Sequence, residues 1–258
     1  MDLKGKFVLV TGASRGIGRA FARAAARENA NLILAVRKTD DSLNAELLKL
    51  GAPSVRSLVA DLSAREGVDR LVQQLADQQV DVLFNNAGLL TGGLLEEQPL
   101  EDIYAMLQVN VSALIHLTHA LLPGMIKRKQ GKIINHSSVS AVMHFPCAST
   151  YAASKAAVWA FTDCLQQELH GTGVSTLCLF TPGVKTEMFD RIDVLYSKNM
   201  NTPKGSVSPD EYAERIISAV RDDQVYLEPS GATGAAFWSA RYLRGLFNFA
   251  VSKGFHRS

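Results

Sequence analysis

The chain has 258 residues, 47% of them hydrophobic, and a formal net charge of +2. This length suits one α/β domain covering residues 1–258, and the small net charge gives no reason to expect a nucleic-acid partner. Cys147, Cys164 and Cys178 are odd in number and widely spaced, which excludes a disulfide framework, a zinc site and a redox dithiol, so we expect no metal. The N-terminal residues hold only a short apolar run, so we expect no signal peptide, no membrane span and a cytoplasmic protein.

A glycine-rich turn follows the first predicted strand. Residues 7–10 form a short apolar run, and residues 19–28 follow a helical pattern. Glycines between a strand and a helix let the backbone turn sharply and approach a phosphate, which the positive end of the helix dipole attracts. This context predicts a nucleotide site formed by Gly12, Ser14, Arg15, Gly16, Ile17 and Gly18.

Basic residues stand where an NAD-selecting fold usually carries a carboxylate. The second predicted strand, residues 31–36, is followed directly by Arg37 and Lys38. A guanidinium group binds phosphate through paired, charge-assisted hydrogen bonds, so Arg37 together with Arg15 favours the 2′-phosphate of NADP. Solvent-facing charge after a strand is the alternative interpretation.

Polar residues also follow the third and fourth predicted strands. The third, residues 55–60, ends at Asp61 and Leu62, where Asp61 either caps the next helix or holds the adenine ring, since Ser63 is an equally good cap. The fourth, residues 80–84, continues into Asn85, Asn86, Ala87 and Gly88. Side chains at the carboxyl ends of parallel strands face the ligand crevice, so we place Asp61, Leu62 and the Asn86–Gly88 segment in the cofactor site.

Asn110 lies inside a long predicted helix, residues 100–122, among apolar neighbours. An asparagine in the middle of a helix is unfavourable and needs a hydrogen-bond partner. One interpretation is a capping or helix-packing amide. The other is a side chain, or a freed backbone carbonyl, that anchors an active-site water.

A hydroxyl, a phenol and an amine are predicted to meet at the same edge of the sheet. The fifth strand, residues 132–135, delivers Ser138, and the helix over residues 151–169 opens with Tyr151 and Lys155. Residues four apart lie one turn apart on one helix face, and an ammonium beside a phenol favours the phenolate. A free tyrosine has a pKa of about 10, and bringing it near neutrality takes roughly 4 kcal/mol, of which Lys155 supplies only part.

The remaining elements complete an alternation of strands and helices. Residues 174–180 form the sixth strand, residues 209–220 a helix and residues 224–227 the seventh strand, while residues 184–208 show no regular pattern and predict a mobile substrate lid. The alternation predicts an α/β fold, a doubly wound Rossmann-type parallel sheet of about seven strands with helices on both faces.

The C-terminal segment, residues 234–258, is aromatic and basic. Apolar side chains cover most of one predicted helix, and Arg241, Arg244 and Asn248 form a narrow polar stripe. We expect this amphipathic helix to be buried against the core or a neighbouring subunit. A wall over an apolar substrate pocket and a basic contact with a membrane surface are the alternatives.

Together these motifs resemble the short-chain dehydrogenase/reductase family over residues 6–227. The matching residues are Thr11, Gly12, Gly16, Gly18, Asn85–Gly88, Asn110, Ser138, Tyr151, Lys155, Pro182, Gly183 and Thr186. The resemblance implies that Tyr151 is the general acid or base and that Ser138 donates a hydrogen bond to the substrate oxygen. It implies that Lys155 binds the nicotinamide ribose and, with the cationic nicotinamide ring, lowers the pKa of Tyr151. Asn110 would hold a water in a proton relay towards Lys155.

The resemblance also extends the cofactor site. It assigns the Asn86–Gly88 segment to the ribose side and Thr186 to the nicotinamide carboxamide, and it adds Tyr151, Lys155, Pro182, Gly183 and Val184 to the residues that hold the cofactor. His136 departs from the family pattern, which has an apolar or small residue at this place. We expect it to hydrogen-bond to the backbone rather than act as a second acid.

We therefore expect an NADP(H)-dependent oxidoreductase that transfers a hydride between the nicotinamide and a carbonyl or secondary alcohol. A non-catalytic NADP(H)-binding sensor or scaffold is the alternative, and a sugar-nucleotide epimerase or dehydratase ranks last because such enzymes usually have a larger C-terminal domain. An apolar pocket predicts a lipid-, steroid- or aromatic-ketone-like substrate. Its predicted residues are Ser138, Met143, His144, Phe145, Cys147, Met188 and Phe189. By the habit of the family, we expect a homodimer or homotetramer that pairs through the helix of Tyr151 and the helix before it.

Overall fold

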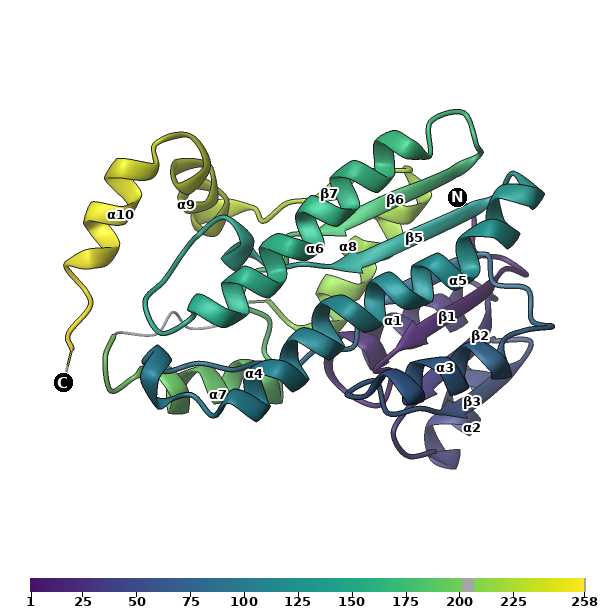
Figure 1. Ribbon diagram of the computed structural model, residues 1–258. Helices are drawn as coiled ribbons and strands as arrows, with labels where there is room; N and C mark the ends of the chain where they lie inside the picture. The colour runs from purple at the N-terminus through teal and green to yellow at the C-terminus, as the bar shows by residue number, and fades with distance from the viewer. Residues whose placement is uncertain (201–206, 258) are drawn as a thin grey trace.

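A parallel sheet of seven strands forms the centre of the molecule (Figure 1). The computed structural model describes residues 1–200 and 207–257. The strands lie in the order β3-β2-β1-β4-β5-β6-β7, and every neighbouring pair is parallel. Their bounds are β1 Phe7–Thr11, β2 Asn31–Val36, β3 Val55–Val59, β4 Val82–Asn85, β5 Gly131–His136, β6 Val174–Leu179 and β7 Tyr226–Leu227. The predicted doubly wound sheet is confirmed, and the order of its strands reverses between β1 and β4, which is where such sheets bind ligands.

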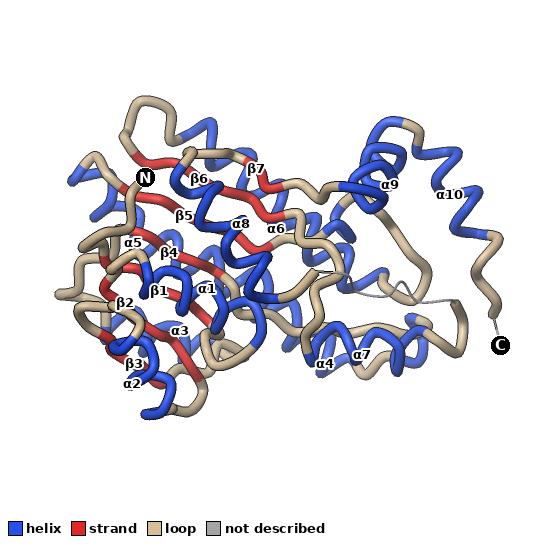
Figure 2. The backbone as a smooth tube through the Cα atoms, turned by 180° about the vertical axis from the view of Figure 1, so that it is seen from behind, coloured by secondary structure: helices blue, strands red, loops and turns tan. Residues whose placement is uncertain are grey.

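Helices cover both faces of this sheet (Figure 2). One layer contains α1 Gly16–Arg27, α2 Asp41–Lys49 and α8 Pro209–Arg221, and the other contains α3 Arg65–Gln74, α5 Ala113–Arg128 and α6 Ser149–Glu168. Side chains alternate between the two layers along each strand. In β1, for example, Val8 and Val10 pack against the first layer and Leu9 against the second. Because both faces are covered, the central strands are mostly apolar, although β5 also buries Lys132 and Asn135.

The predicted single helix over residues 100–122 is divided into parts. α4 Leu100–Leu107 runs into a π-turn at Gln108–Ser112, which α5 continues. Residues 100–128 together are long and apolar enough to cross a membrane, but Leu114 and Leu117 are buried against the sheet. The core therefore accounts for part of the apolar composition of this stretch.

The segment over residues 184–208 contains a helix that the sequence pattern did not predict. α7 Glu187–Tyr196 occupies its first half, and residues 201–206 of the predicted lid lie outside the described residues. The prediction of an irregular segment is wrong for α7, because Ile192, Leu195 and Tyr196 pack at helical spacing into one apolar cluster with Leu94. Tertiary packing stabilises this short helix.

The C-terminal segment forms two helices instead of the single buried helix that we expected. α9 Gly231–Tyr242 and α10 Arg244–Ser252 are separated at Leu243, whose backbone leaves the helical conformation. They project from one end of the molecule (Figures 1 and 2). Phe237 and Phe247 pack against the body, but most other large side chains of these helices are exposed.

Candidate active site

The glycine-rich turn leaves the first turn of α1 open to an anion. Arg15 occupies the N-cap in an extended conformation and makes no side-chain cap, so within the described residues no side chain caps the first N–H groups of α1. Gly12 has a φ of +66°, a conformation that L side chains rarely adopt. A Cβ atom at Gly18 would collide with Asn86 Nδ2 and the Gly12 carbonyl, so α1 packs here directly on the end of β4. This cradle fits the pyrophosphate of a dinucleotide.

A cavity of about 460 Å³ opens at the carboxyl ends of the strands beside this turn. Predicted cofactor residues that line it are Gly12, Ser14, Arg15, Gly16, Ile17, Arg37, Asp61, Leu62, Asn86, Ala87, Gly88 and Thr186. Residues that sequence reasoning did not assign to the cofactor also line it, among them Ala35, Val36, Ala60, Ser63, Leu89, Val109, His136, Lys185, Glu187, Met188 and Pro209. Most of these residues are next to a predicted cofactor residue in the sequence. Their position in the sequence was therefore the signal that could have assigned them to the cofactor site.

The other predicted cofactor residues lie outside the cavity lining. Gly18 packs against Asn86 and Gly12, which do line the cavity. Val184 is buried in the core and forms an isolated parallel β-bridge with Val207. Lys38, Tyr151, Lys155, Pro182 and Gly183 do not line the cavity either. Lys155 nevertheless lies just behind it, because a Cβ atom at Gly88 would lie 3.8 Å from Lys155 Nζ.

Charged side chains mark the end of the cavity at β2 and β3. Arg37 and Arg15 both line it, and Arg15 forms an exposed ion pair with Glu187 at the start of α7. Asp61 accepts hydrogen bonds from the backbone N–H and hydroxyl of Ser63, at 3.0 and 2.8 Å, which lower the pKa of Asp61. Neither Asp61 nor Ser63 caps α3, whose N-cap is Ala64 without a side-chain bond, so capping by either residue is excluded.

Asn86 and His136 form the wall between the glycine-rich turn and the catalytic residues. Asn86 Nδ2 donates to the carbonyls of Thr11 and Gly12, so Asn86 Oδ1 faces His136 Nδ1 at 3.1 Å. The imidazole must therefore donate from Nδ1, which leaves Nε2 as an acceptor. Burial, and secondarily the charge of Lys155, lower the pKa of His136 to about 3. His136 is thus a neutral residue that bonds to a side chain, whereas we expected a backbone partner.

Tyr151 and Lys155 lie one turn apart on α6, with Lys155 Nζ 5.6 Å from the centre of the Tyr151 ring. Lys155 is buried and donates to the carbonyl of His136 at 2.7 Å. Burial raises the pKa of Tyr151 to about 12, although hydrogen bonding with Ser138 opposes the shift, and burial lowers the pKa of Lys155 to about 8. The polypeptide alone therefore does not lower the pKa of the phenol. The predicted lowering depends on the positive charge of a bound cofactor.

The side chain of Asn110 is fully engaged inside the protein. Its Oδ1 accepts from the N–H of Leu89 at 2.8 Å, and its Nδ2 donates to the Leu89 carbonyl at 3.0 Å and to Ser154 Oγ at 3.1 Å. Asn110 thus fixes the loop after β4 to α6. A π-turn also leaves a backbone carbonyl without its usual helical donor, which is the group that remains for a water.

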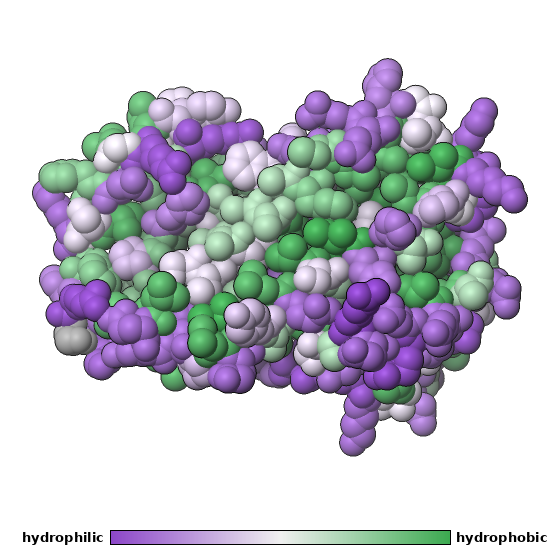
Figure 3. Space-filling view, viewed as in Figure 1, coloured by the Kyte–Doolittle hydropathy of each residue, from purple (hydrophilic) through white to green (hydrophobic). Residues whose placement is uncertain are grey.

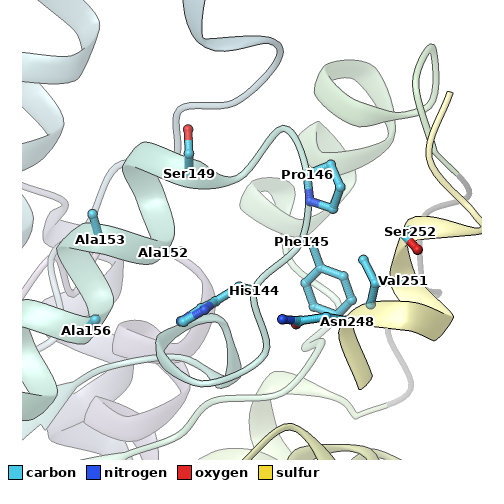
Figure 4. Close-up of a pocket in the computed structure, with 10 residues that line it drawn as sticks. All are labelled: His144, Phe145, Pro146, Ser149, Ala152, Ala153, Ala156, Asn248, Val251 and Ser252. Carbon is cyan, nitrogen blue, oxygen red and sulfur yellow. The ribbon is translucent and has the colours of Figure 1, made fainter. Parts of the chain in front are cut away.

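The predicted substrate residues do not surround one cavity. Met143 is buried in the core near Phe237, and Met188 lines the cofactor cavity. His144 and Phe145 line a separate groove of about 600 Å³ between α6 and α10 (Figure 4). Phe189 lines neither cavity, and Cys147 is buried in the cluster that also holds Tyr196.

Sequence reasoning missed Tyr196. This side chain is buried above Gly92, where a Cβ atom would collide with the ring, and its hydroxyl donates to the Thr91 carbonyl at 3.3 Å. Burial raises its pKa, and the neighbouring phenol of Tyr151 contributes. Tyr196 therefore anchors α7 beside the catalytic residues. Its spacing from Ile192 was the signal that could have found it.

Comparisons with known proteins agree with this geometry. The family described as short chain dehydrogenase matches residues 6–194. The ketoacyl reductase HetN of Nostoc is 32% identical over 85% of this chain and 77% of its own length, and the fatty acyl-CoA reductase of Acinetobacter baylyi is 34% identical over 85% and 74%. A short-chain dehydrogenase from Sphingobium yanoikuyae, solved in complex with NADPH, has a TM-score of 0.79 and 27% identity, with 98% of each chain covered. An alcohol dehydrogenase from Thermococcus sibiricus, complexed with 5-hydroxy-NADP, has a TM-score of 0.76 and 28% identity, with 89% of this chain and 98% of that chain covered.

Proposed function

Because the chain belongs to the short-chain dehydrogenase family of oxidoreductases, we propose that it is an NADP(H)-dependent enzyme that interconverts a carbonyl and a secondary alcohol on an apolar substrate. The observation that carries this proposal is the placement of Lys155 behind Gly88, between the nucleotide cavity and Tyr151. When bound, the nicotinamide supplies the hydride in reduction and accepts it in oxidation. A pure NADP(H) sensor or scaffold would have no use for a buried phenol and amine at this place.

Tyr151 and Ser138 act on the substrate oxygen. In reduction Tyr151 gives its phenolic proton to the carbonyl oxygen while the carbonyl carbon receives the hydride, which yields the alcohol. The Ser138 hydroxyl lies close enough to hydrogen-bond with Tyr151, and it stabilises the charge that develops on the same oxygen. In oxidation the Tyr151 phenolate takes the proton of the alcohol, and the steps reverse.

Lys155 and Asn110 help to supply protons to Tyr151. The Lys155 ammonium is buried 5.6 Å from the centre of the Tyr151 ring, and its positive charge would stabilise the phenolate that forms when Tyr151 gives up its proton. Asn110 positions the loop that carries Gly88 and Leu89, and the π-turn around it offers a carbonyl for a water that returns a proton to Lys155. We assign Lys155 to catalysis and the Asn110 side chain to positioning.

Arg15 and Arg37 support a preference for NADP over NAD. Both line the cavity near Asp61, and the first residue after β2 is Arg37 instead of a carboxylate. A phosphate on the adenosine ribose would gain two guanidinium partners. Arg15 would give up its ion pair with Glu187 to bind this phosphate. The complexes of similar structures with NADPH and 5-hydroxy-NADP support the same choice.

An acyl-chain carbonyl is the substrate class that the surroundings favour. The cluster next to Tyr151 is apolar and includes Leu94, Phe145, Leu195 and Tyr196. Relatives named as a ketoacyl reductase, a 3-oxoacyl-[acyl-carrier-protein] reductase and a fatty acyl-CoA reductase support this class. We also propose a homodimer that pairs through α5 and α6, over which apolar surface is concentrated (Figure 3).

The test is NADPH oxidation by wild type and by Tyr151→Phe with a panel of 3-oxoacyl thioesters, long-chain ketones and cyclic ketones. Loss of the acid should lower kcat at least about a hundredfold while NADPH binding persists. Tyr104→Phe, at a phenol that is 70% exposed, is the matched control and should behave as wild type. Undiminished turnover by Tyr151→Phe would refute the mechanism, and NADPH binding by wild type without turnover of any carbonyl would favour the sensor.

A further inference from the structure

The two C-terminal helices expose a set of large apolar side chains, which we call the C-terminal patch. Its members, with their exposed fractions, are Trp238 56%, Tyr242 61%, Leu243 47%, Leu246 62% and Phe249 59%. The rings of Trp238 and Tyr242 are in contact, with centroids 5.5 Å apart. Isolated apolar residues on a surface need no explanation, but five large exposed apolar side chains on two consecutive short helices indicate an interaction surface.

The members of the patch on α10, Leu246 and Phe249, lie on the side of this helix that faces away from the body of the protein. Phe247 is buried and packs edge-on against Phe145, with centroids 5.8 Å apart, and Val251 lines the groove between α10 and α6 (Figure 4). Leu246 and Phe249 lie on the opposite side of the helix, three residues apart. One side of α10 therefore attaches it to the body, and the other is free for a partner.

The charged side chains of the C-terminal segment itself have one sign. Residues 229–258 contain no Asp or Glu, but they include Arg241, Arg244, Lys253 and Arg257. Arg241 pairs with Glu228 and Arg257 pairs with Glu96. Arg244 and Lys253 form no ion pair within the described part of the chain, and Lys253 Nζ lies 4.4 Å from the centre of the Phe249 ring. Arg244 donates a hydrogen bond to His144 Nδ1 at 3.1 Å, so these two cations lie beside apolar side chains and neither is paired with a carboxylate of the described residues.

We propose that the C-terminal patch docks this protein onto the surface of an anionic lipid bilayer. Aromatic and leucine side chains would enter the interface between headgroups and acyl chains, while Arg244 and Lys253 pair with anionic headgroups beside them. A second copy of this chain fits less well, because a two-fold contact between two such patches would bring cations together without carboxylates. Phe145 connects α10 to the loop before Tyr151, so docking would place this loop near the source of an apolar substrate.

The test is co-sedimentation of the full chain with vesicles of phosphatidylcholine, with and without phosphatidylglycerol. We expect binding to the anionic vesicles that weakens as salt is added, because charged headgroups contribute to it. The double variant Leu246→Ser and Phe249→Ser should weaken binding at least about tenfold. Arg244→Gln with Lys253→Gln should remove the preference for phosphatidylglycerol.

The matched control is Leu100→Ser, a leucine that is 63% exposed on α4 and should leave binding unchanged. Retained NADPH binding and an unchanged melting temperature would show that the variants are folded, and they separate this proposal from the proposed enzymatic function. Absence of vesicle binding by wild type would overturn the proposal. So would a dimer in solution that the Leu246→Ser and Phe249→Ser variant converts to a monomer, because the patch would then be a subunit interface.

Discussion

His136 donates from Nδ1 to Asn86 Oδ1 across 3.1 Å, and this pair joins the ends of β5 and β4 beside the nucleotide cavity. Since Asn86 also donates to the carbonyls of Thr11 and Gly12, the pair ties three neighbouring strands at one edge of the sheet. A protonated imidazole does not fit here, because it would place a second positive charge near Lys155.

This pair makes the stability of the protein depend on pH. The pKa of His136 falls from 6.5 to about 3 on folding, so below pH 6.5 the unfolded chain binds a proton that the folded chain does not. The free energy of unfolding should therefore decrease as pH falls, by about 2 kcal/mol between pH 6.5 and about 5. Urea denaturation of wild type and His136→Gln would measure this slope. The variant should lose it, whereas His119→Gln at an exposed histidine should keep it.

Gly18 lies in a helix, where alanine is usually favoured, but we predict that a side chain at this position destabilises the protein. Gly18→Ala would push its Cβ into Asn86 and the Gly12 carbonyl, so we expect a loss of about 1–3 kcal/mol in the free energy of unfolding and weaker NADPH binding. Gly245→Ala is the control, because nothing lies within 4 Å of its added Cβ. Calorimetry should show that this second variant is as stable as wild type or more so. Equal stability of both variants would contradict the packing argument.

Two buried lysines at opposite ends of β5 offer a direct comparison. Lys155 has a pKa lowered to about 8 by burial, so its charge is a cost to the folded state. Lys155→Met should lower kcat at least about a hundredfold while the free energy of unfolding stays level or rises. Lys132 bonds to Asp223, Ser175 and the Gln224 carbonyl far from Tyr151, so Lys132→Met should leave kcat unchanged. Steady-state kinetics together with urea denaturation would separate a catalytic lysine from a structural one. Equal losses of kcat in the two variants would contradict this assignment.

Cofactor selectivity should follow Arg37. Arg37→Asp should reduce the ratio of kcat/KM for NADPH to that for NADH about a hundredfold or more, because a carboxylate repels the 2′-phosphate and accepts from ribose hydroxyls. Arg56→Asp, at an exposed arginine on β3, makes the same change of charge away from the cavity and should leave the ratio unchanged. A similar drop in both variants would point to long-range charge instead of a phosphate contact.

The strands and most helices could be predicted from sequence because their signals are local. The buried parallel strand β2 is an unbroken apolar run after its first residue, Asn31, and the turn after Thr11 has its glycines in the context that a phosphate site needs. α7 was missed because charged residues interrupt its apolar ones. The helical spacing of Ile192 and Leu195 becomes decisive only through their packing against Leu94.

Contacts between residues that are far apart in the sequence could not be predicted from local sequence patterns. His136 and Asn86 are 50 residues apart, and no periodicity in either segment reveals that their side chains meet. The apolar surface of the C-terminal helices was visible in the sequence, but which residues would be covered by the body depends on tertiary contacts such as that between Phe247 and Phe145. The side-chain partners of Asn110 were likewise hidden, because Leu89 and Ser154 come from two other segments.

The helix α7 runs from the nucleotide cavity to the surroundings of Tyr151. Its first residue, Glu187, lines the nucleotide cavity, and its last, Tyr196, rests on Gly92 beside Tyr151. A ligand that moves one end of a rigid helix also moves the other end, and it thereby changes the binding free energy of a second ligand there. By thermodynamic reciprocity, a nucleotide that tightens substrate binding through α7 must itself be held more tightly, by the same factor, once substrate is bound.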